Sequence, residues 1–391
     1  MKICLAICEY NPLHNGHLKH LDYIKKNLKC DYTAVILSGN FTQRGETAVM
    51  NKYLRAKHAV MSGADIVFEL PAVFAVAPAE IFARGAVKLL SELPGEKYLC
   101  FGTESGTEEN LTATAKALIT ETKEFKLLLK EELKTGVTHI KAKINALTKM
   151  NLENVNFDLL NSPNNILGIE YTKAVLSNEK DIKIRPIIRG GAGYNDREIY
   201  KDLSSAAAIR KAIADGKLKK IKNNLPSYVY ADLPETLPSA DELIFYSLIT
   251  TPKADLKNVL DCTEGLENRI KALIKDSKSI PELMEKLKTK RYTESRLKRI
   301  VMSNMLGIRA KFVRRCLNSE LYLKVLAVKK DSLNLLSDFQ KNCELPFLTR
   351  KSDFGKLSGT ALECFNTDVK ANDIYNLVTK GKTNEFDMKI I

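Results

Sequence analysis

Three features that would place a chain in a membrane or in an oxidising compartment are missing from this sequence. No stretch reaches the roughly 18–20 apolar residues that a bilayer-spanning helix needs. No signal-peptide pattern precedes the opening MKICLAICEY. The eight cysteines include no Cys-x-x-Cys pair, and their spacings fit neither a zinc site nor a compact disulfide framework. We therefore expect a soluble, cytoplasmic protein whose cysteines are reduced, with Cys4 and Cys100 buried in strands.

Internal repeats and low-complexity tracts are also missing from the sequence. The 391 residues suffice for two or three domains, and the hydrophobic fraction of 45% is that of an ordinary globular protein, so long disordered stretches are not expected. Positive charge is in excess, because 61 Lys and Arg stand against 47 Asp and Glu and give a net charge of +14. This excess favours a polyanionic partner, whether nucleic acid, nucleotide phosphates or an anionic membrane, and charge alone does not choose among them.

Strand-like and helix-like segments alternate over the first two hundred residues. Short apolar runs predict strands at 3–7, 33–37, 64–70, 98–101 and 182–188, and helical spacing predicts helices at 18–28, 52–61, 79–90, 107–150, 163–176 and 206–213. Such alternation predicts an α/β fold with a parallel sheet covered by helices, which binds ligands at the carboxyl ends of its strands. The polar segments that follow the strands, at 9–15, 38–45 and 102–104, are therefore the first candidates for a site.

A change in pattern near residue 225 predicts a domain boundary. Three prolines (Pro226, Pro234 and Pro238) fall in a stretch without periodicity, and the sequence beyond them is mainly helical. We expect one domain at 1–225 and a mainly helical domain at 226–391. An apolar stripe predicts one long docked helix, and weaker patterns predict a strand at 321–328 and helices at 332–339 and 371–378. The stripe consists of Leu297, Val301, Met305, Ile308 and Phe312.

The first predicted strand runs into the motif Glu9-Tyr10-Asn11-Pro12-Leu13-His14-Asn15-Gly16-His17, which contains two of the five histidines. Histidines three apart at a helix start lie on the same side of the helix, and the start itself offers unpaired N–H groups and positive dipole character. Gly16 lets a phosphate approach the backbone closely. Together these groups would suit the charge that develops on an α-phosphate when pyrophosphate leaves. The alternative is that His14 and His17 merely cap the helix.

The second predicted strand is followed by Ser38-Gly39-Asn40-Phe41-Thr42-Gln43-Arg44-Gly45, and then by Lys52 and Arg55 on one face of a helix. Arg44 is a fork donor suited to carboxylate or phosphate. A cationic cluster beyond the carboxyl end of a strand favours triphosphate or pyrophosphate binding. The alternative is that Lys52 and Arg55 form a solvated basic face.

Further polar segments follow later strands. They are Phe101–Glu104, Pro163–Tyr171 and the glycine-rich turn RGGAGYND from Arg189 to Asp196. A helix that Ser204 or Ser205 could cap then carries Arg210 just inside its start, an arrangement that can hold β- and γ-phosphates. The alternative for Ser205 is an ordinary N-cap.

The ordered set of motifs resembles one family. His14-Asn15-Gly16-His17 looks like the HxGH signature of the nucleotidyltransferase superfamily, whose HUP-type fold is Rossmann-like. EYNPLHNGH, SGNFTQRG, GADIVFELP, FARGAVKLL, FGTES, NNILGIEY and the IR-containing helix, spread over residues 1–215, resemble the bacterial tRNA(Met) cytidine acetate ligases. The resemblance implies that acetate and ATP, with Mg²⁺, form acetyl-adenylate and pyrophosphate. The acetyl group then passes to the N4 amine of the wobble cytidine of elongator tRNA(Met), which gives N4-acetylcytidine and AMP.

With this resemblance, we expect the domain at 1–225 to bind ATP and carry out the catalysis, and the basic charge of the domain at 226–391 leads us to expect that it binds tRNA. His14 and His17 are the expected catalytic residues, and Arg189, Lys52 and Arg210 would steady pyrophosphate. No cysteine nucleophile is needed, because the intermediate is not covalently bound to the enzyme. The expected ATP contacts are Ile7, Cys8, Glu9, Tyr10, Asn11, Pro12, Leu13, Asn15, Gly16, His20, Gly102, Asn164, Asn165, Arg189, Ser205 and Arg210.

The sequence departs from the family pattern at two positions. The family usually reads RIGAxYHD where this chain has RGGAGYND, with Asn195 in place of a histidine, and it usually has a threonine near Ala207. Any role that the family gives to those two side chains is in doubt here, whereas the remaining match is unaffected.

A basic segment lies between Lys286 and Arg315, where eleven Lys and Arg accompany a single acid, Glu294. With an apolar face docked, the basic groups would face outward and bind the tRNA backbone in a salt-sensitive way, while Tyr292 could stack on a base. The alternative is a generic solvated helix. The expected tRNA contacts are Lys288, Lys290, Arg291, Arg296 and Arg299.

Two rival functions remain open at this stage. The first is adenylyl transfer to a small molecule such as nicotinamide mononucleotide or a pantetheine phosphate, which the long basic C-terminal half disfavours. The second is a non-catalytic tRNA-binding protein, which the intact HxGH disfavours. No bound metal site, membrane or protein partner is predicted.

Overall fold

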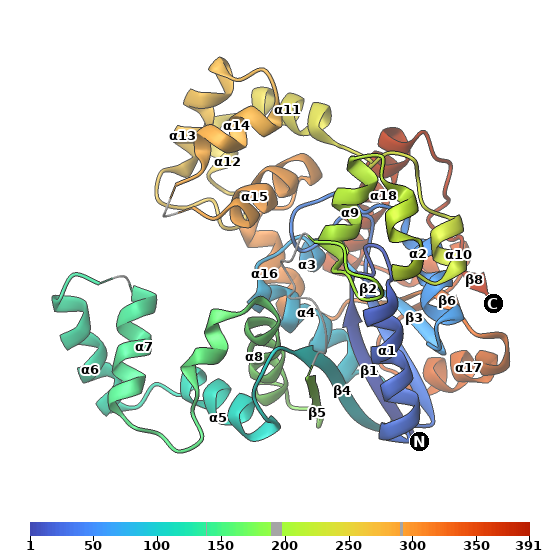
Figure 1. The fold of residues 1–391 in the computed structure, drawn as a ribbon, viewed down its shortest axis with the longest axis horizontal. Coiled ribbons are helices and arrows are strands. Elements are labelled where there is room, and N and C mark those ends of the chain that lie inside the picture. The colour runs from blue at the N-terminus through green and yellow to red at the C-terminus, as the bar shows by residue number, and fades with distance from the viewer. Residues whose placement is uncertain (138, 189–197, 290–291) are drawn as a thin grey trace.

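The computed structural model describes residues 1–137, 139–188, 198–289 and 292–391, and a mixed sheet lies at its centre (Figure 1). The strand order is β5-β4-β1-β2-β3-β6-β7, with β8 paired to β6. Strands β1 to β5 run parallel to their neighbours, whereas β6 runs antiparallel to β3. The strands are β1 (Lys2–Cys8), β2 (Tyr32–Ser38), β3 (Ile66–Leu70), β4 (Glu96–Thr103), β5 (Lys183–Ile188), β6 (Leu323–Val328), β7 (Phe347–Leu348) and β8 (Lys389–Ile390).

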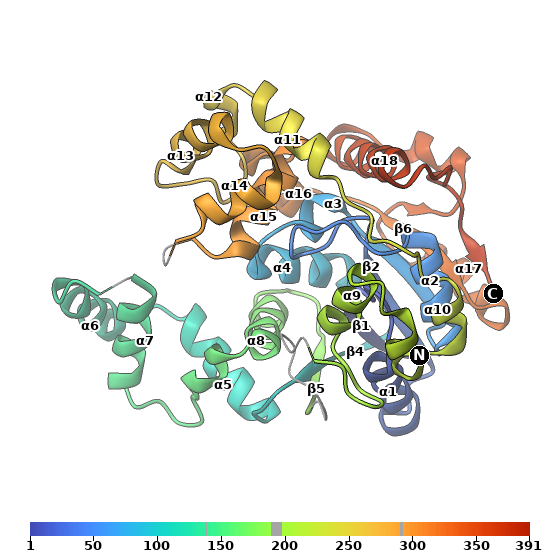
Figure 2. The ribbon, with the colours of Figure 1, turned by 45° about the horizontal axis from the view of Figure 1, so that its top comes forward.

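Helices cover both faces of the sheet, so that alternate strand residues enter two different cores. Ile3 and Leu5 pack in one core, and Cys4 and Ala6 pack in the other. The first core includes residues of α3 (Ala72–Ala75), α4 (Ala79–Ser91) and α8 (Pro163–Leu176). The second includes residues of α1 (Asn15–Tyr23), α2 (Lys52–Met61), α9 (Ala206–Ala214) and α10 (Ser227–Ala231), which Figure 2 shows on the other side of the strands.

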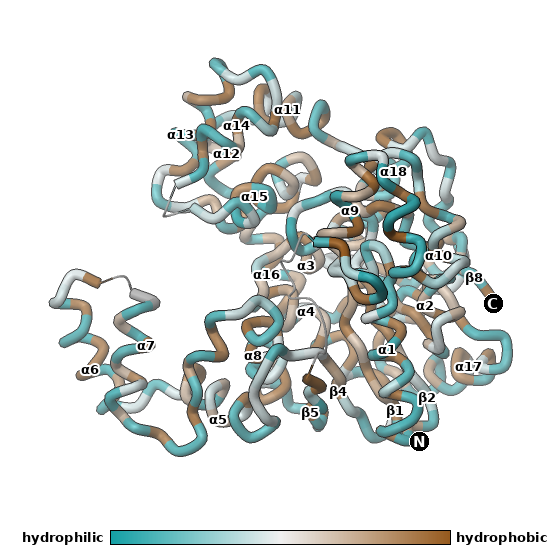
Figure 3. The backbone as a smooth tube through the Cα atoms, viewed as in Figure 1, coloured by the Kyte–Doolittle hydropathy of each residue, from teal (hydrophilic) through white to brown (hydrophobic). Residues whose placement is uncertain are grey.

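Two helical arms extend from the same side of this body, at the left of Figure 1. One arm consists of α5 (Glu108–Ile119), α6 (Lys123–Lys134) and α7 (His139–Lys149). The other consists of α11 (Asp241–Thr250), α12 (Lys253–Leu256), α13 (Leu266–Leu273) and α14 (Ile280–Leu287). The arms carry many hydrophilic residues, whereas the central strands are hydrophobic (Figure 3). No helix in the described ranges is long and apolar enough to cross a bilayer.

The chain changes direction across the sheet between β1 and β4. It moves outward from β1 through β2 to β3 and then returns to the opposite side of β1 for β4 and β5. Such a reversal leaves a crevice at the carboxyl ends of the two central strands, which is the usual ligand site of open α/β sheets. The segments that follow β1 and β4 begin at Glu9 and Glu104, so the predicted motifs lie beside this crevice.

The periodicity of apolar residues correctly predicted most helices and strands of the first half of the chain. The helices expected at 52–61 and 163–176 are α2 and α8 with those bounds, and the five expected strands are β1 to β5. The expected single striped helix is wrong, because Gly307 adopts a left-handed conformation with φ of 78° and separates α15 (Glu294–Leu306) from α16 (Ala310–Asn318). The terminal helix expected at 371–378 is longer than predicted, since α18 spans Gly359–Thr379 and follows α17 (Leu333–Asn342).

The C-terminal segment contributes to the same sheet as the N-terminal half. Strand β6 pairs with β3, and α18 packs against α3. The boundary near residue 225 remains a prediction. However, the residues beyond it are not only a helical appendage, because three of their segments lie in the sheet.

Candidate active site

A cavity of about 390 Å³ lies at the carboxyl ends of the central strands. It is bounded by the β1–α1 segment, the loop that follows β2, the end of β4, α8 and the start of α9. Its lining consists of Ile7, Cys8, Glu9, Tyr10, Asn11, His14, Gly16, His17, Lys19, His20, Tyr23, Thr42, Gln43, Arg44, Glu46, Phe82, Phe101, Gly102, Asn164, Leu167, Tyr171, Ile187, Ile188, Ser205, Ala206, Ala207 and Arg210.

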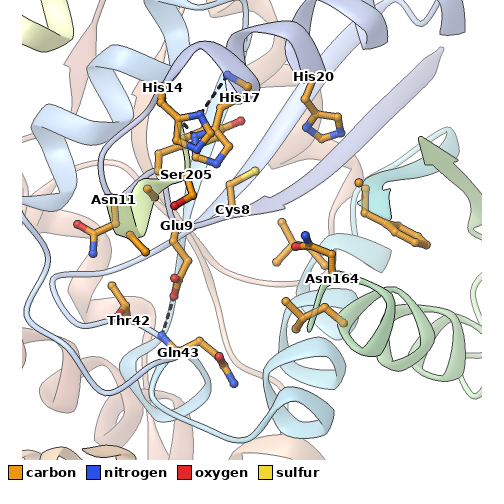
Figure 4. Close-up of a pocket in the computed structure, with 18 of the residues that line it drawn as sticks. Cys8, Glu9, Asn11, His14, His17, His20, Thr42, Gln43, Asn164 and Ser205 are labelled. Atoms are coloured by element: carbon orange, nitrogen blue, oxygen red, sulfur yellow. Dashed lines mark hydrogen bonds between the residues drawn. The ribbon is translucent and has the colours of Figure 1, made fainter. Parts of the chain in front are cut away.

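The two motif histidines cap α1 and also line this cavity. His14 Nδ1 accepts a hydrogen bond from the Gly16 N–H at 3.0 Å, and His17 Nδ1 accepts one from the His14 N–H at 3.3 Å. Their rings stack with centroids 3.8 Å apart (Figure 4). An imidazole nitrogen that accepts a backbone N–H carries no proton, so the proton of each neutral ring resides on Nε2. The caps therefore fix both rings as Nε2–H donors.

Gly16 is required by the packing of this cap. A Cβ at this position would lie 2.9 Å from Cε1 of His14 and 3.0 Å from its Nδ1, which would push the imidazole out of place. The first turn of α1 therefore combines backbone N–H groups, the helix dipole and two imidazole donors at one point. This arrangement can stabilise an anionic group with several oxygens.

Glu9 extends from the end of β1 into the same cavity, on the side of the β2 loop (Figure 4). Its Oε1 accepts a hydrogen bond from the Gln43 N–H at 2.6 Å and one from the Ser38 hydroxyl at 3.5 Å. Burial raises the pKa of this carboxyl above its usual range, although the cationic side chains of Arg210 and Arg44 lower it in part. A carboxyl group with raised pKa beside anion-binding donors is suited to proton transfer.

Arg210 links the cavity to the C-terminal half of the chain. One of its N–H groups donates to the Asn11 carbonyl at 2.8 Å, and its other terminal nitrogen lies 3.2 Å from the Glu46 carboxylate. Glu46 also pairs with Lys298 of α15 at 3.2 Å. Ser205 is the ordinary N-cap of α9, because its Oγ accepts from the Ala208 N–H at 3.0 Å, and it lines the cavity as well.

The β4 and α8 side of the cavity is more apolar. Phe101 and Tyr171 lie with ring centroids 5.5 Å apart, and Gly102 and Asn164 stand beside them. The amide of Asn164 donates to Glu104 at 2.6 Å. A flat apolar group between these residues would leave the anionic end of the same ligand at the α1 N-terminus.

Most of the sequence-predicted contacts line the cavity, but four do not. Asn165 is buried and its side-chain oxygen accepts from the Glu104 N–H at 2.8 Å, so it shapes the loop after β4. Asn15 donates to the carbonyls of Asp202 and Asn223 at 3.1 and 2.7 Å. Pro12 and Leu13 are buried outside the lining. Arg189 and Asn195 lie outside the described residues, and Ala207 lines the cavity with a methyl group.

The expectation that Lys52 steadies pyrophosphate is wrong. Lys52 is 1% exposed, and its ammonium group pairs with Glu69 at 2.8 Å and with Glu385 at 2.6 Å. Arg55 is fully buried and donates to the backbone carbonyls of Glu9, Ser38, Gly39 and Met50. The solvated-face alternative is wrong as well, because both cations are internal. Arg55 holds the segments after β1 and β2 in place, whereas Lys52 ties α2 to β3 and to the C-terminal tail.

Several lining residues were missed in the predicted contact set. Thr42, Gln43 and Arg44 belong to the polar motif after β2, and the position of that motif at the end of a strand could have predicted that they line the cavity. The positions of Phe82, Tyr171 and Lys19 depend on how α4, α8 and α1 approach the sheet, which local periodicity does not give. Burial raises the pKa of Cys8 to about 12, so its thiol is protonated at neutral pH and is a poor nucleophile.

The predicted basic surface of α15 is largely engaged within the protein. Arg296 and Arg299 each contact Asp261 at 3.7 Å, and the Arg299 side chain is only 12% exposed. Tyr292 is buried beneath the Arg296 guanidinium, so it does not offer a free stacking face. Lys288 is exposed and lies 3.8 Å from Glu294. Lys290 and Arg291 lie outside the described residues.

Exposed basic residues gather instead on α16. Lys311, Arg314 and Arg315 are exposed there, while Phe312 and Val313 are buried, so the apolar face docks and the basic face is outward. These three residues line an open hollow together with Arg309. Arg315 also pairs with Glu363 of α18 at 2.5 Å.

Nearly the whole chain is similar to known proteins. The family described as HIGH Nucleotidyl Transferase matches residues 1–389. The tRNA(Met) cytidine acetate ligase of Caldanaerobacter subterraneus subsp. tengcongensis is 37% identical over 385 residues, which cover 96% of this chain and 95% of that protein. Two crystal structures of Thermotoga maritima TmcAL cover both chains completely at 29% identity. The apo form has a TM-score of 0.92, and the form bound with alpha-thio ATP has a TM-score of 0.89.

Proposed function

The chain belongs to the HIGH Nucleotidyl Transferase family and to the tRNA(Met) cytidine acetate ligases, and we therefore propose that it is an ATP-dependent ligase that modifies tRNA. The proposed reaction condenses acetate with ATP to acetyl-adenylate and pyrophosphate. The acetyl group then passes to the N4 amine of the wobble cytidine of elongator tRNA(Met), with release of AMP.

The single observation that carries this proposal is the histidine pair at the start of α1. His14 and His17 combine two Nε2–H donors with the positive end of the α1 dipole, in a cavity whose other end is apolar and aromatic. The adenosine would lie toward Phe101, Gly102 and Asn164, and the α-phosphate at the histidines. Because the α-phosphate would then lie next to the imidazole donors, this placement of ATP supports attack at the α-phosphorus rather than at the γ-phosphorus.

In the first step an acetate oxygen attacks the α-phosphorus and the bond to the pyrophosphate oxygen breaks. Acetate attacks as an anion and pyrophosphate leaves as an anion, so no proton has to be removed. His14, His17 and the amide groups would stabilise the charge on the phosphoryl oxygens. Arg210 and Arg44, both in the cavity lining, would attract the departing pyrophosphate or the acetate carboxylate.

In the second step the N4 amine of cytidine attacks the acyl carbon, and the bond from that carbon to the phosphate oxygen of AMP breaks. The enzyme needs no covalent intermediate, which agrees with the protonated thiol of Cys8. The same donors that bound the α-phosphate would stabilise AMP as the leaving group.

We propose that Mg²⁺ enters as part of the ATP substrate rather than as a resident ion. Within the described ranges no group of three or more His, Cys, Asp or Glu side chains could hold a metal. Mg²⁺ commonly binds through substrate phosphates with few protein ligands, so the residues fit MgATP and not a dedicated metal centre.

The tRNA backbone would be bound by the exposed basic residues on the C-terminal half. Lys311, Arg314 and Arg315 of α16 supply an outward cationic face, and Lys288 is a further exposed cation. Arg296 and Arg299 would act mainly by holding the loop of Asp261 against α15. Phosphate contacts of this type position a nucleic acid and do not by themselves read its sequence.

The decisive test is mass spectrometry of tRNA nucleosides after incubation of the protein with ATP and isotope-labelled acetate. We expect labelled N4-acetylcytidine in elongator tRNA(Met) when ATP is present and no labelled product when ATP is left out. Adenylylation of a small mononucleotide without any tRNA product would support the first rival function. Binding of tRNA without turnover of ATP would support the second.

A further inference from the structure

We propose that Glu9 is a catalytic residue that accepts the proton released when the tRNA amine attacks the acyl-adenylate. This inference rests on the proposed function and concerns its second step only. Glu9 lines the same cavity as the histidine pair, and its carboxylate points toward the loop after β2, where the Gln43 N–H donates to it at 2.6 Å (Figure 4).

The proton balance of the reaction places the need for a base in the second step. The first step consumes an acetate anion and releases a pyrophosphate anion, so no N–H or O–H bond breaks. In the second step the amine nitrogen forms a bond to the acyl carbon and becomes cationic. It must then lose one proton, while the electron pair of the breaking C–O bond leaves with AMP. The structure assigns that proton to the carboxylate of Glu9.

The histidine pair is unsuited to this task. Nδ1 of His14 and Nδ1 of His17 each accept a backbone N–H, so the remaining nitrogen of each neutral ring already carries a proton. These rings can donate to phosphoryl oxygens, but neither presents a basic nitrogen to the cavity without breaking the cap of α1. A different group must therefore accept the proton.

Glu9 and Glu46 are the carboxylates among the described lining residues. The Glu46 carboxylate already forms two ion pairs, with Arg210 at 3.2 Å and with Lys298 at 3.2 Å. Glu9 has no ion pair of this kind within the described residues, because its partners are the Gln43 amide and the more distant Ser38 hydroxyl. These two bonds fall on Oε1, and within the described residues no hydrogen bond reaches Oε2, so this oxygen is the one that can take up a proton.

The surroundings of Glu9 keep the carboxylate usable as a base. The charged and titratable groups that face it are Arg44 in the loop after β2, Arg210 on α9, Arg55 on α2 and Cys8 on β1. Burial raises the pKa of Glu9, and the three guanidinium groups limit that rise. A carboxylate with pKa closer to neutrality removes a proton more effectively than a fully solvated one.

The test compares the two steps in a Glu9→Gln variant. Glutamine keeps the length of the side chain and an oxygen that can accept from Gln43, but it cannot bind a proton. We expect acetate-dependent ATP–pyrophosphate exchange within about threefold of the original protein. Single-turnover transfer from acetyl-adenylate to tRNA should fall by about 100-fold or more. The transfer rate of the unaltered protein should rise with pH to a plateau, and this dependence should vanish in Glu9→Gln.

Glu109→Gln supplies the control, because Glu109 is an exposed carboxylate on α5, outside the cavity lining. This variant makes the same chemical change and should retain both the transfer rate and its pH dependence to within a few-fold. If Glu9→Gln fails to fold, Glu9→Asp replaces it. Aspartate keeps a carboxylate at altered reach, so transfer should slow while its pH dependence persists.

Three outcomes would overturn the inference. Transfer by Glu9→Gln at the original rate would exclude Glu9 as the base, and an equal loss of both steps would assign it to ATP binding. An equal loss of transfer in Glu109→Gln would show that the effect is not specific to the carboxylate in the cavity. Failure of the proposed function is distinguishable from all three, because the unaltered protein would then show no acetate-dependent exchange.

Discussion

At the scale of single residues, His14 has two roles. Its Nδ1 caps the start of α1, and its Nε2–H is the proposed donor to a ligand in the cavity. The sequence motif predicted both roles as alternatives, and the geometry makes them compatible. Local sequence could not reveal that Lys52 is buried, because its partner Glu69 is on the next strand, β3, and its partner Glu385 is in the C-terminal tail, 333 residues away. Residue types in a motif predict chemistry best where the partners are close in sequence.

The substitution His14→Asn separates the two roles of this residue. Asparagine is a favourable N-cap, so the helix should be retained and the melting temperature should change little. Loss of the imidazole donor should lower acetate-dependent ATP–pyrophosphate exchange by about 10² to 10³-fold. His14→Ala should lose about 1 kcal/mol of stability as well. Exchange at the original rate in His14→Asn would contradict the role of the ring as a donor.

The environment of Asp368 leads us to predict that the free energy of unfolding depends on pH. It accepts hydrogen bonds from the Ala72 N–H and the Tyr322 hydroxyl, and burial, together with the charge of Glu69, raises its pKa from 3.8 to about 7. The folded state therefore holds a proton that the unfolded chain has released between about pH 4 and pH 7. Since the unfolded state binds fewer protons in that window, stability falls as the pH rises, by up to about 1.4 kcal/mol per pH unit.

The substitution Asp368→Asn should remove this part of the pH dependence. Denaturant unfolding from pH 4 to pH 7 would show a smaller decline in the free energy of unfolding than in the original protein. Asp373→Asn is a matched control, because Asp373 is an exposed acid on the same helix. Equal slopes in all three proteins would show that Asp368 titrates normally.

At the scale of elements, periodicity predicted the strands and helices of the first half because each buries a regular pattern of apolar residues. Helices α2 and α8 were predicted with their observed bounds. The break between α15 and α16 was missed because a single glycine in the left-handed conformation interrupts an otherwise regular stripe. The pairing of β6 with β3 was missed because strand partners far apart in sequence leave no local signal.

The docking of the β2 loop on α15 can be tested at Gly45. A Cβ at Gly45 would lie 2.4 Å from the carbonyl carbon of Lys298, and the residue has φ of 70°. Gly45→Ala should therefore destabilise the protein by backbone strain of about 1 kcal/mol or more and by the clash in addition. The control is Gly216→Ala, whose φ of 68° is similar but whose Cβ would meet open space. Thermal unfolding should show a clearly larger loss at Gly45, and equal losses would mean that the loop is not docked there.

At the scale of the whole molecule, the cavity lies at the carboxyl ends of the central strands, and the C-terminal half returns to add strands to the same sheet. The net charge predicted a polyanionic partner, but the charge could not show which cations are already paired. Arg296 and Arg299 have internal partners, whereas the basic residues of α16 face outward. Such a distribution depends on which acids from other segments fold against each helix, and one segment of sequence does not contain that information.

The proposed tRNA surface predicts a difference between two lysines. Lys311→Glu on α16 should weaken tRNA binding and should reduce the slope of log affinity against log salt by about 1. Lys341→Glu, at an exposed position on α17, should leave both quantities unchanged. Filter binding across a salt series measures both. Equal effects of the two substitutions would show that α16 makes no specific contribution to the tRNA surface.

The proposed chemistry depends on the first turn of α1 holding the α-phosphate of ATP, and a crystal structure with a non-hydrolysable ATP analogue would show whether it does. We predict that an α-phosphate oxygen lies within hydrogen-bond distance of Nε2 of His14 or His17, with the adenine toward Phe101 and Gly102. A triphosphate bound at any other place on the molecule, with this turn of α1 unoccupied, would show that α1 does not bind the α-phosphate.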